Sequence, residues 1–429
     1  MSDADDVTHG TDAVAVGAGG CPAAARARAF DIFHADGDSV ADPYPLLREL
    51  QRDCPLTRSD RFDGYWIATR YEDVSRILRD PVRFSSAENF IPPTADPVFG
   101  KAIPLQIDRP DHTLYRRVIA PFFSPAAVAR LEAKTREAAR ELIEPIAAGE
   151  RCEFVGDFCA PFPALVFLPL LGLSRDELDD LLALHTELLE FNRIGPGEAA
   201  DIGQRRIAAS RALRDRIDTL LDDRAASADP PDDIVTGLLR SQDGERTLER
   251  QEAVRLVRLF FSAGLDTVKS TLSMMVWFLA SHPDERRRLV QDPAAIPGAV
   301  EEFLRYFSPT SFARIATEDV DFGEVTIRAG EMVLFSTLVA NRDPQRFPDP
   351  DAVDFARLPN PHLGLGAGPH RCAGSHLARM ELTVALEEIH RAMPEYEVLP
   401  GAEVPWHAGT IIGVDQLALT IGGGDRSPR

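Results

Sequence analysis

The longest regular pattern in this chain is helical and runs from about Leu248 to Ser281. At about 1.5 Å per residue, a helix of this length would extend for about 50 Å and cross the whole molecule. The sequence therefore predicts one long helix that spans the fold.

Helical patterns also dominate the rest of the chain, from Pro110 to about Glu252 and in a final helix over residues 373–393. The strand-like pieces are short and gather at both ends of the sequence, which predicts a mainly α protein with a minor β part. Residues 1–40, rich in Gly, Ala and Asp, are interpreted as a loose N-terminal tail, and residues 41–429 as a single domain. Residues 85–107 form a long proline-rich loop, and such loops are usually functional.

Composition and charge exclude several classes of protein. The net charge is −21, from 68 acidic and 47 basic residues, and a phosphate backbone would be repelled by such a surface. No stretch of about 20 apolar residues exists, and the N-terminus is acidic where a secretory signal is positive. Five irregularly spaced cysteines suit a reducing compartment better than a disulfide framework. We expect a cytoplasmic monomer with no nucleic-acid or membrane partner.

The segment from His362 to Gly374 (HLGLGAGPHRCAG) carries the strongest local signal. Its alternating glycines let the backbone turn sharply and approach a flat partner closely. Cys372 stands at the start of the following helix, where free N–H groups and partial positive charge lower the pKa of a thiol. The pattern indicates a reactive or metal-binding thiolate, and the alternative is a buried structural cysteine.

A glutamate and an arginine three residues apart, Glu302 and Arg305, precede this segment by about 70 residues. Such a pair is often only a surface salt bridge worth a few tenths of a kcal/mol. His112 and Arg116 place two basic groups on one face of a helix, and each alone is typical of a solvent-exposed charge.

Within the long helix, Ala263-Gly264 is followed closely by Asp266-Thr267. The small pair allows the helix to bend against a flat ring, and the threonine hydroxyl can break the helical hydrogen-bond ladder. The alternative is an ordinary helix with a surface pair between Asp266 and Lys269.

In this order and spacing, the segments resemble the cytochrome P450 family over about residues 43–421. The haem-binding signature of that family is Phe-Gly-x-Gly-x-His-x-Cys-x-Gly. The chain matches it at Gly366, Gly368, His370, Cys372 and Gly374. Leu365 departs from the pattern because the family usually has Phe there, so the more distant segments carry much of the resemblance.

The resemblance implies the cytochrome P450 fold, a triangular helical prism with haem b between the long central helix and the helix after the Cys loop. Cys372 would be the axial thiolate ligand of the iron, and Thr267 and Asp266 would be the catalytic residues that manage proton delivery. Glu302 and Arg305 would bond Arg357 and lock the side of the haem that carries the thiolate. Further haem contacts are implied at His112, Arg116, Arg314 and His370 for the propionates, and at Ala263, Gly264, Leu365, Gly366, Gly368 and Gly374 for the ring.

The resemblance also implies a monooxygenase that hydroxylates or otherwise oxidises a lipophilic small molecule with O2 and two external electrons. The chain has no room for a fused flavin or iron–sulfur domain, so we expect a ferredoxin, served by a ferredoxin reductase, to dock on a basic face. That face would contain Arg116, Arg117, Arg130, Arg371 and Arg379. The segments GLDTV and HAGTIIGVDQLAL look most like the terpenoid-hydroxylating bacterial branch. The substrate pocket is expected at Phe90, Ile91, Ile103, Phe191, Leu259, Ser262, Leu265, Thr310, Ser311, Phe312, Thr410 and Ile411.

Three alternatives remain open at this point. A P450-like chain can catalyse coupling or peroxide-driven oxidation, or it can bind haem without catalysis, but the paired Asp266 and Thr267 favour monooxygenation. Cys372, His370 and His362 also provide three candidate zinc ligands, although the glycines and the absence of a Cys-x-x-Cys motif are not typical of such a site.

Overall fold

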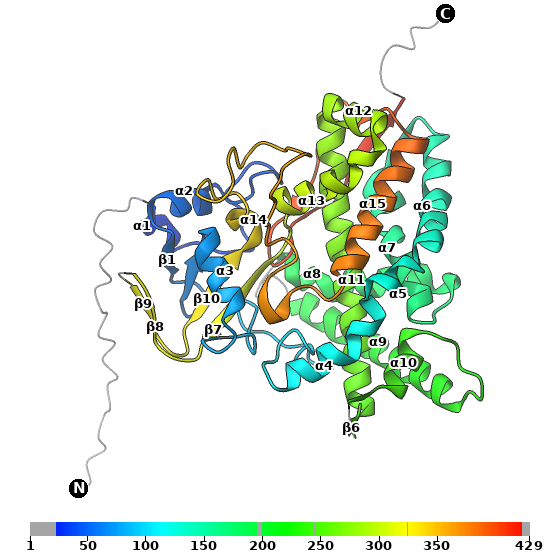
Figure 1. Cartoon of the computed structure of the whole chain (residues 1–429), viewed down its shortest axis with the longest axis horizontal. Coiled ribbons are helices and arrows are strands. Elements are labelled where there is room, and N and C mark those ends of the chain that lie inside the picture. Colours follow the sequence, from blue (N-terminus) through cyan, green and yellow to red (C-terminus); the bar gives the residue numbers. More distant parts are fainter. Residues whose placement is uncertain (1–22, 195–199, 244–245, 324, 423–429) are drawn as a thin grey trace, which may run out of the picture.

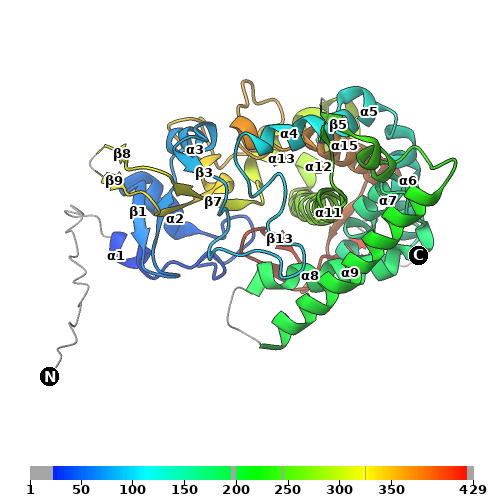
Figure 2. The same cartoon turned by 90° about the horizontal axis from the view of Figure 1, so that it is seen from below.

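The computed structural model describes residues 23–194, 200–243, 246–323 and 325–422 (Figure 1). Its longest helix is α11 (Arg250–Ser281), of 32 residues, which is seen end-on among the other helices in Figure 2. It contacts α7 (Pro161–Leu170), α9 (Ala200–Ala226) and α15 (Ser375–Ala392). The predicted long helix is confirmed, and its side chains are mostly buried because helices surround it.

The ends of α11 follow from local chemistry. The Glu249 carboxylate accepts a hydrogen bond from the third amide of the helix, and the Glu252 carboxylate accepts one from the Glu249 amide at 2.8 Å. This reciprocal cap satisfies two amides that would otherwise lack partners. Pro283 follows the helix and begins α12 (Pro283–Gln291), since proline suits a first helical turn.

A five-stranded sheet lies on the other side of the molecule from most of the helices (Figure 1). In it β10 pairs parallel with β2 and antiparallel with β7. Its strands, in spatial order, are β1 (Leu56–Ser59), β2 (Tyr65–Ala68), β10 (Met332–Ser336), β7 (Ser311–Ala316) and β3 (Phe84–Ser85). The smaller strands are β4 (Arg151–Glu153), β5 (Gln242–Asp243), β6 (Arg246–Thr247), β8 (Val320–Phe322), β9 (Val325–Ile327), β11 (Tyr396–Val398), β12 (Trp406–His407), β13 (Gly413–Val414) and β14 (Ala418–Ile421).

The remaining helices complete a mainly α fold with a minor β part, as the sequence predicted. They are α1 (Ala24–Ala27), α2 (Pro45–Asp53), α3 (Tyr71–Arg79), α4 (Asp111–Ile119), α5 (Pro125–Ala129), α6 (Glu132–Ala147), α8 (Leu178–Ile194), α10 (Ile234–Arg240), α13 (Ile296–Tyr306) and α14 (Thr337–Ala340). No helix within the described ranges is both long and apolar enough to cross a bilayer.

The boundary of the N-terminal tail was predicted too far along the chain. Residues 23–40 are ordered, because α1 packs there and Phe30 and Ile32 are buried in the main core. The strands are also not confined to the ends of the sequence, since β4 lies in the middle and pairs with β14.

Cys54 is disulfide-bonded, which the expectation of a reducing compartment did not anticipate, whereas Cys152, Cys159 and Cys372 are free.

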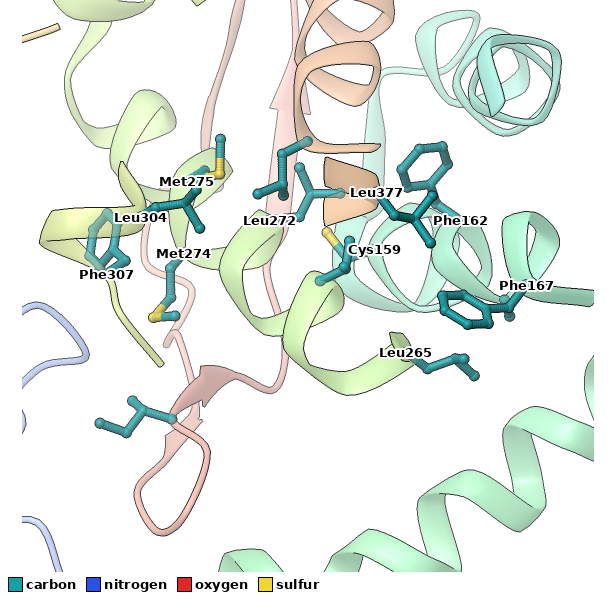
Figure 3. Packing of buried hydrophobic residues seen from close by; sticks show 14 of the residues in the cluster. Cys159, Phe162, Phe167, Leu265, Leu272, Met274, Met275, Leu304, Phe307 and Leu377 are labelled. Atoms are coloured by element: carbon teal, nitrogen blue, oxygen red, sulfur yellow. The ribbon is translucent and has the colours of Figure 1, made fainter. Parts of the chain in front are cut away.

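The main hydrophobic core surrounds α11 (Figure 3). Leu265, Leu272, Met274 and Met275 of α11 are each at most 3% exposed. They pack among α7, α13 and α15, so the central helix is held in one position relative to the segments on either side.

Candidate active site

A cavity of about 290 Å³ lies between the middle of α11 and the segment that precedes α15. Cys372 lines it from one side, and Ala263 and Thr267 line it from α11. Ala263 is exposed although it sits halfway along a buried helix, because its methyl group faces this cavity. The structure therefore brings the Cys loop and the predicted oxygen-side motif of α11 to the same space.

The Cys loop is shaped by glycines that serve different purposes. Gly366 lines the cavity at a φ of +69°, a conformation that L side chains rarely adopt. A Cβ on Gly364 would lie 2.1 Å from the Leu304 carbonyl oxygen. A Cβ on Gly368 would lie 2.2 Å from the Leu78 carbonyl oxygen of α3. Gly366 and Gly374 line the cavity as expected, but Gly368 does not, because its close approach is to α3.

The environment of the Cys372 thiol differs in one respect from the prediction. The Cys372 residue is exposed toward the cavity, but desolvation by the surrounding protein raises the pKa of its thiol. The Gly374 amide and the guanidiniums of Arg116, Arg371 and Arg379 only partly oppose this effect. The predicted lowering of the pKa by a helix N-terminus is thus wrong for this structure. The cysteine precedes the first residue of α15, Ser375, by three positions, so it lies outside the first turn. Its amide donates to the Leu365 carbonyl at 2.8 Å, which fixes the turn.

Four basic side chains meet at one edge of the cavity, His112, Arg116, Arg314 and His370. The rings of His112 and His370 lie 4.1 Å apart between centroids. Burial and the nearby guanidiniums lower the pKa of His112 to about 4, and burial with Arg314 lowers that of His370 to about 3. Burial also lowers the pKa of Arg314 to about 10. All four positions were predicted from the sequence.

These groups fit a flat, dianionic ligand such as haem. The Nε2 atom of His112 is buried and has no hydrogen-bond partner among the described residues. The Arg314 guanidinium, only 5% exposed as a residue, donates within the described residues only to the adjacent Ala313 carbonyl at 2.7 Å. Buried polar and cationic groups of this kind require anionic or hydrogen-bonding partners. Two propionates at this edge would supply them, and Cys372, which lines the same cavity, would hold the iron.

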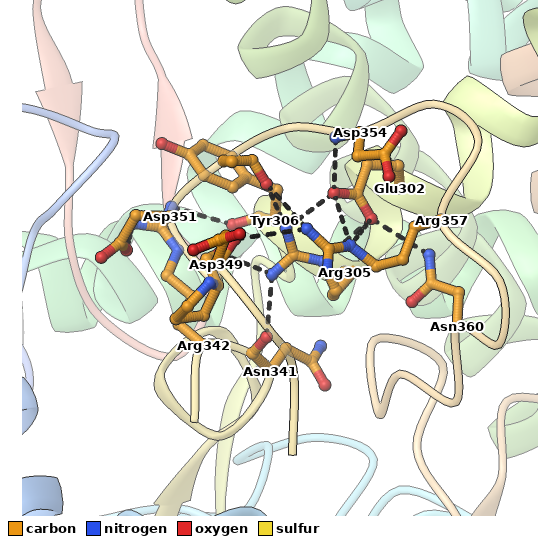
Figure 4. A network of polar contacts seen from close by, with 12 residues as sticks. Glu302, Arg305, Tyr306, Asn341, Arg342, Asp349, Asp351, Asp354, Arg357 and Asn360 are labelled. Atoms are coloured by element: carbon orange, nitrogen blue, oxygen red, sulfur yellow. Dashed lines mark hydrogen bonds and ion pairs between the residues drawn. The ribbon is translucent and has the colours of Figure 1, made fainter. Parts of the chain in front are cut away.

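An ion-pair network with a fully buried centre lies behind the Cys loop (Figure 4). Arg305 donates to Glu302 through Nε at 2.9 Å and through Nη2 at 2.7 Å, and both residues are 0% exposed. Arg357 donates from Nε to both oxygens of Glu302 at 3.1 Å. Asn360 and the Asp354 amide donate to the same carboxylate at 3.1 and 2.9 Å. The predicted partnership of the three residues is present, and the surface-pair alternative for Glu302 and Arg305 is wrong.

The helix α11 presents a row of small and hydroxylated residues to the cavity. Thr267 donates to the Ala263 carbonyl at 2.8 Å, and Thr271 donates to the Thr267 carbonyl at 2.7 Å. Gly264 also lines the cavity, but a Cβ there would lie 2.2 Å from the Phe167 ring of α7. Glycine at this position therefore allows close helix packing as well as access to the cavity.

Asp266 does not line the cavity. It is 3% exposed, and its carboxylate lies 3.6 Å from the Lys269 ammonium. The pair between these residues is real, but it is buried rather than at the surface. Because Asp266 does not line the cavity and Thr267 does, a proton from Asp266 would have to pass through other groups to reach Thr267.

The predicted substrate residues are only partly brought together. Leu259, Thr310 and Phe312 line the cavity. Phe90 packs against Phe312, with 5.8 Å between ring centroids. Phe191 lies on α8, but its side chain is outside the described residues. Those that do not line the cavity are Phe90, Ile91, Ile103, Ser262, Leu265, Ser311, Thr410 and Ile411.

The reasons for these misses are local. Ile91, Ile103 and Leu265 are buried in the main core. The Ser262 hydroxyl donates to the Leu259 carbonyl at 3.2 Å and accepts from Arg258 at 2.9 Å, so α11 turns it away from the cavity. Ser311 pairs with Ser336 across the sheet and donates its amide to the Thr410 carbonyl at 2.9 Å.

Several cavity residues were not found from the sequence: Phe123, Phe167, Thr271, Leu304, Phe335 and Glu381. Thr271 follows Thr267 by four positions, so helical spacing was a usable signal for it. The others come from distant segments that only the folded chain brings together.

The zinc alternative is not supported by the arrangement of side chains. His362 lies 3.1 Å from the Glu301 carboxylate and accepts a hydrogen bond from the Gly364 amide at 3.1 Å. No group of three or more His, Cys, Asp or Glu residues within the described ranges is placed to hold a metal ion. Cys372 is thus left as a single protein ligand, as an axial haem thiolate would be.

Comparisons with known proteins agree with this geometry. The family model described as "Cytochrome P450" matches residues 200–400. The chain is 34% identical to mycinamicin IV hydroxylase/epoxidase of Micromonospora griseorubida, over 90% of this chain and 97% of that protein. The chain belongs to the cytochrome P450 family.

Further cytochrome P450 relatives span nearly the whole chain. Pentalenic acid synthase of Streptomyces avermitilis is 32% identical over 90% of this chain and 96% of its own length. The crystal structure of cytochrome P450 CYP101C1 superposes with a TM-score of 0.81 at 31% identity, covering 93% of this chain and 98% of that one. The P450 fold predicted from the motifs is confirmed, and the chain is a haem-thiolate monooxygenase by family.

Proposed function

We propose that this cytochrome P450 oxidises a lipophilic natural product, with hydroxylation as the principal reaction. The observation that carries the proposal is the single cavity that joins Cys372, the four basic side chains and Thr267. We further propose that the chain from Ala23 onward, rather than from residue 41, acts as one domain around this site.

The chain's residues take defined roles in the proposal. Haem, when bound, supplies an iron centre that activates molecular oxygen with electrons from outside. Cys372 would bind that iron, Arg116 and Arg314 would neutralise the propionates, and the neutral rings of His112 and His370 would donate hydrogen bonds to them. Thr267 holds a hydrogen-bonding hydroxyl on the opposite wall, and Asp266 supplies protons to it through intervening groups.

The cavity wall supports an apolar substrate. Leu259, Phe260, Phe167 and Phe312 surround the space above Ala263 with hydrocarbon, and such walls bind lipophilic molecules with few polar anchors. The relatives named for mycinamicin IV, pentalenic acid and vitamin D3 act on large lipophilic molecules, which favours a terpenoid or macrolide-sized substrate here.

An external ferredoxin is the proposed electron donor. Arg116, Arg371 and Arg379 lie close enough to Cys372 to act on its charge, and Arg117 and Arg130 are exposed. Arg379 is ion-paired with Glu301, so it contributes less positive charge to this face than expected. Electrostatic steering would thus depend mainly on the other basic residues.

Reversal of Arg130 to Glu tests the docking face. We expect reduction of the haem-loaded protein by a [2Fe–2S] ferredoxin to slow, with a weaker dependence on salt. Reversal of Arg151, which is exposed on β4, is the matched control and should leave the rate unchanged. Equal rates for wild type and Arg130→Glu would contradict ferredoxin docking at this face.

The reaction itself is tested with a library of terpenoids and macrolides. Compounds that shift the spin state of the haem-loaded protein are incubated with ferredoxin, its reductase and 18O2. We expect one 18O atom in the product. In Thr267→Ala, product per oxygen consumed should fall, whereas Ser262→Ala, which removes a hydroxyl turned away from the cavity, should not change it. Products formed equally well without the electron donors, from peroxide alone, would favour the peroxide-driven alternative, and oxygen consumption without any product would favour non-catalytic haem binding.

A further inference from the structure

One wall of the cavity is built by β7 with the residue before it and by β10 with the residue after it. Every second residue of these two segments lines the cavity, namely Thr310, Phe312, Arg314, Phe335 and Thr337. Side chains at alternate positions share one face of a sheet. Phe312 stands opposite Phe335 in the pairing of the strands, so an apolar middle separates Arg314 at one end of the wall from the two threonines at the other.

The hydrogen bonds of the two threonines have a defined direction. The Thr337 hydroxyl donates to the Thr310 carbonyl at 2.8 Å. A carbonyl only accepts, so this bond uses the single hydrogen of the Thr337 hydroxyl. The two hydroxyl oxygens lie 3.3 Å apart, and Thr310 is therefore the donor in that contact. The lone pairs of the Thr310 hydroxyl oxygen are left for the cavity, to which Thr310 is an acceptor.

A second acceptor lies beside the same strand. The Ala313 amide of β7 donates to the Asn89 carbonyl at 2.9 Å, and Asn89 lines the cavity with 0% of the residue exposed. Its Nδ2 atom donates to the Leu105 carbonyl at 3.5 Å, whereas its Oδ1 atom has no hydrogen-bond partner among the described residues. A buried acceptor costs free energy until a donor reaches it. A haem propionate cannot be that donor, because a carboxylate only accepts.

We propose that the substrate is a lipophilic molecule that already carries a hydroxyl group, and that this hydroxyl donates a hydrogen bond to Thr310. The inference rests on the proposed function, in which the cavity holds a lipophilic natural product. A ketone or ether oxygen at the same place would meet another acceptor and gain no hydrogen bond. Asn89 offers a further acceptor to a substrate with more than one hydroxyl. The wall therefore selects alcohols over ethers of the same carbon skeleton.

Matched alcohols and ethers test this selection directly. The probes are menthol, farnesol and cyclododecanol, which differ in shape, each compared with its methyl ether. In the haem-loaded protein we expect at least one alcohol to bind about fivefold more tightly than its ether, the contribution of one neutral hydrogen bond. Titration of the ferric spin state measures both dissociation constants. If none of the three alcohols binds more tightly than its ether, the proposal is wrong.

Variants of the threonine pair separate hydrogen bonding from shape. Thr310→Val keeps the size of the side chain and should abolish the preference for the alcohol, whereas Thr310→Ser should retain it. Thr317→Val is the matched control, because Thr317 is exposed just beyond β7 and its hydroxyl donates to the Val82 carbonyl at 2.7 Å. A preference that survives in Thr310→Val would contradict the role of Thr310.

Thr337→Val tests the direction of the hydrogen bonds, and it keeps the proposal testable if Thr310→Val does not fold. Without the Thr337 oxygen, the Thr310 hydrogen can turn to the cavity, so the methyl ether should gain affinity and the preference should narrow. A pair that only shapes the wall would instead weaken the binding of alcohol and ether alike. That result would overturn the proposal.

The outcomes also separate this inference from the proposed function. Library compounds oxidised with one 18O atom, together with no preference for alcohols, would contradict the hydroxyl anchor and leave the proposed function intact. A preference for alcohols that is lost in Thr310→Val, without any oxidised product, would support the anchor and contradict the proposed function.

Discussion

The Cys-loop region (α13 and residues 341–378) and the loop of residues 86–110 border the same cavity but are held in different ways. In the first region, a single side chain, that of Arg305, donates both to Glu302 and to the carbonyls of Asn341, Pro350 and Ala352. The second is an irregular loop that is anchored to α9 and α11 by the carboxylate of Asp96. Arg255 of α11 also donates to its Lys101 carbonyl at 3.1 Å, and the Ala313 amide of β7 donates to its Asn89 carbonyl at 2.9 Å. One region is locked by many bonds to a single buried ion pair, whereas the other is held by a few separate hydrogen bonds, of which those of the Asp96 carboxylate are the most numerous.

The anchor of the 86–110 loop is well defined. The Asp96 carboxylate accepts hydrogen bonds from Ser210 of α9 at 3.0 Å and from Arg258 of α11 at 3.1 Å. It also accepts from the amides of Val98 and Phe99 at 2.9 and 3.1 Å. The thiolate side is therefore held by one dense buried network, and the substrate side by a small number of separate contacts.

The largest effect is expected where the Cys-loop region is broken at its centre. Glu302→Ala leaves the guanidiniums of Arg305 and Arg357 buried without a carboxylate, which should lower the free energy of unfolding by about 3–5 kcal/mol. Denaturant unfolding measures this loss, and haem content after expression should fall with it.

A matched pair at the surface provides the control. Glu285 lies three residues before Arg288, with 2.8 Å between the paired atoms, and the arginine side chain is 60% exposed. Glu285→Ala should therefore cost less than about 0.5 kcal/mol. Similar losses in the two variants would show that burial does not distinguish the two pairs.

The loop anchor should give a smaller, pH-dependent effect. Burial raises the pKa of Asp96, but Arg258 and the two amides outweigh it, so the pKa is lowered from 3.8 overall. The charged carboxylate thus stabilises the fold in full above about pH 4, and this stabilisation is lost as the pH falls through the lowered value. Asp96→Asn should cost about 2 kcal/mol at pH 7, and the difference from wild type should disappear in acid.

Thermal unfolding from pH 7 downward, with limited proteolysis of the loop, measures this dependence. Asp284→Asn, whose side chain is 89% exposed, is the control and should follow wild type at every pH. A loss in Asp96→Asn that is constant down to pH 2 would mean that the charge of Asp96 is not what anchors the loop.

The contact of α11 with α7 lies at the cavity that both regions border, and Gly264→Ala perturbs it. The new methyl group would meet the Phe167 ring at 2.2 Å, and overpacking of this kind costs about 1–3 kcal/mol. Gly203→Ala on α9, where nothing lies within 4 Å, should instead gain up to about 1 kcal/mol. Thermal denaturation compares them, and adding Phe167→Leu to Gly264→Ala should restore stability. Failure of that rescue would exclude the ring as the cause.

The smallest effect concerns the departure at Leu365. This residue lines the cavity and its carbonyl accepts from the Cys372 amide, so a change of side chain alters packing beside the sulfur. Leu365→Phe should shift the reduction potential of the haem-loaded protein by less than about 59 mV, a tenfold change in a one-electron equilibrium. Identical potentials in a spectroelectrochemical titration would contradict the prediction.

The same comparison explains how much the sequence could predict. Glu302, Arg305 and Arg357, like the four basic residues at the cavity edge, were predictable because buried charges must have partners and few arrangements satisfy them. The substrate side was predicted less well. Ile91 and Ile103 in the loop are apolar whether they face a cavity or the core, and their sequence carries no signal to separate the two. Ser262 was misplaced because one turn of helix decides which way a hydroxyl points.

Two errors had other physical causes. The pKa of Cys372 was predicted from a helix N-terminus, but burial, which depends on the whole fold, has the larger effect. Gly368 was assigned to a flat partner, whereas the backbone of α3 is what it approaches. In both cases the determining contacts come from segments that are distant in the sequence, so the local pattern did not show them.

The most direct test of the central claim is the absorption spectrum of the haem-loaded protein after reduction and addition of carbon monoxide. We expect a strongly red-shifted Soret band, which is lost in Cys372→Ala and retained in Cys152→Ala. A folded, haem-loaded protein without that band, or a band that survives Cys372→Ala, would contradict the assignment of Cys372 as the iron ligand.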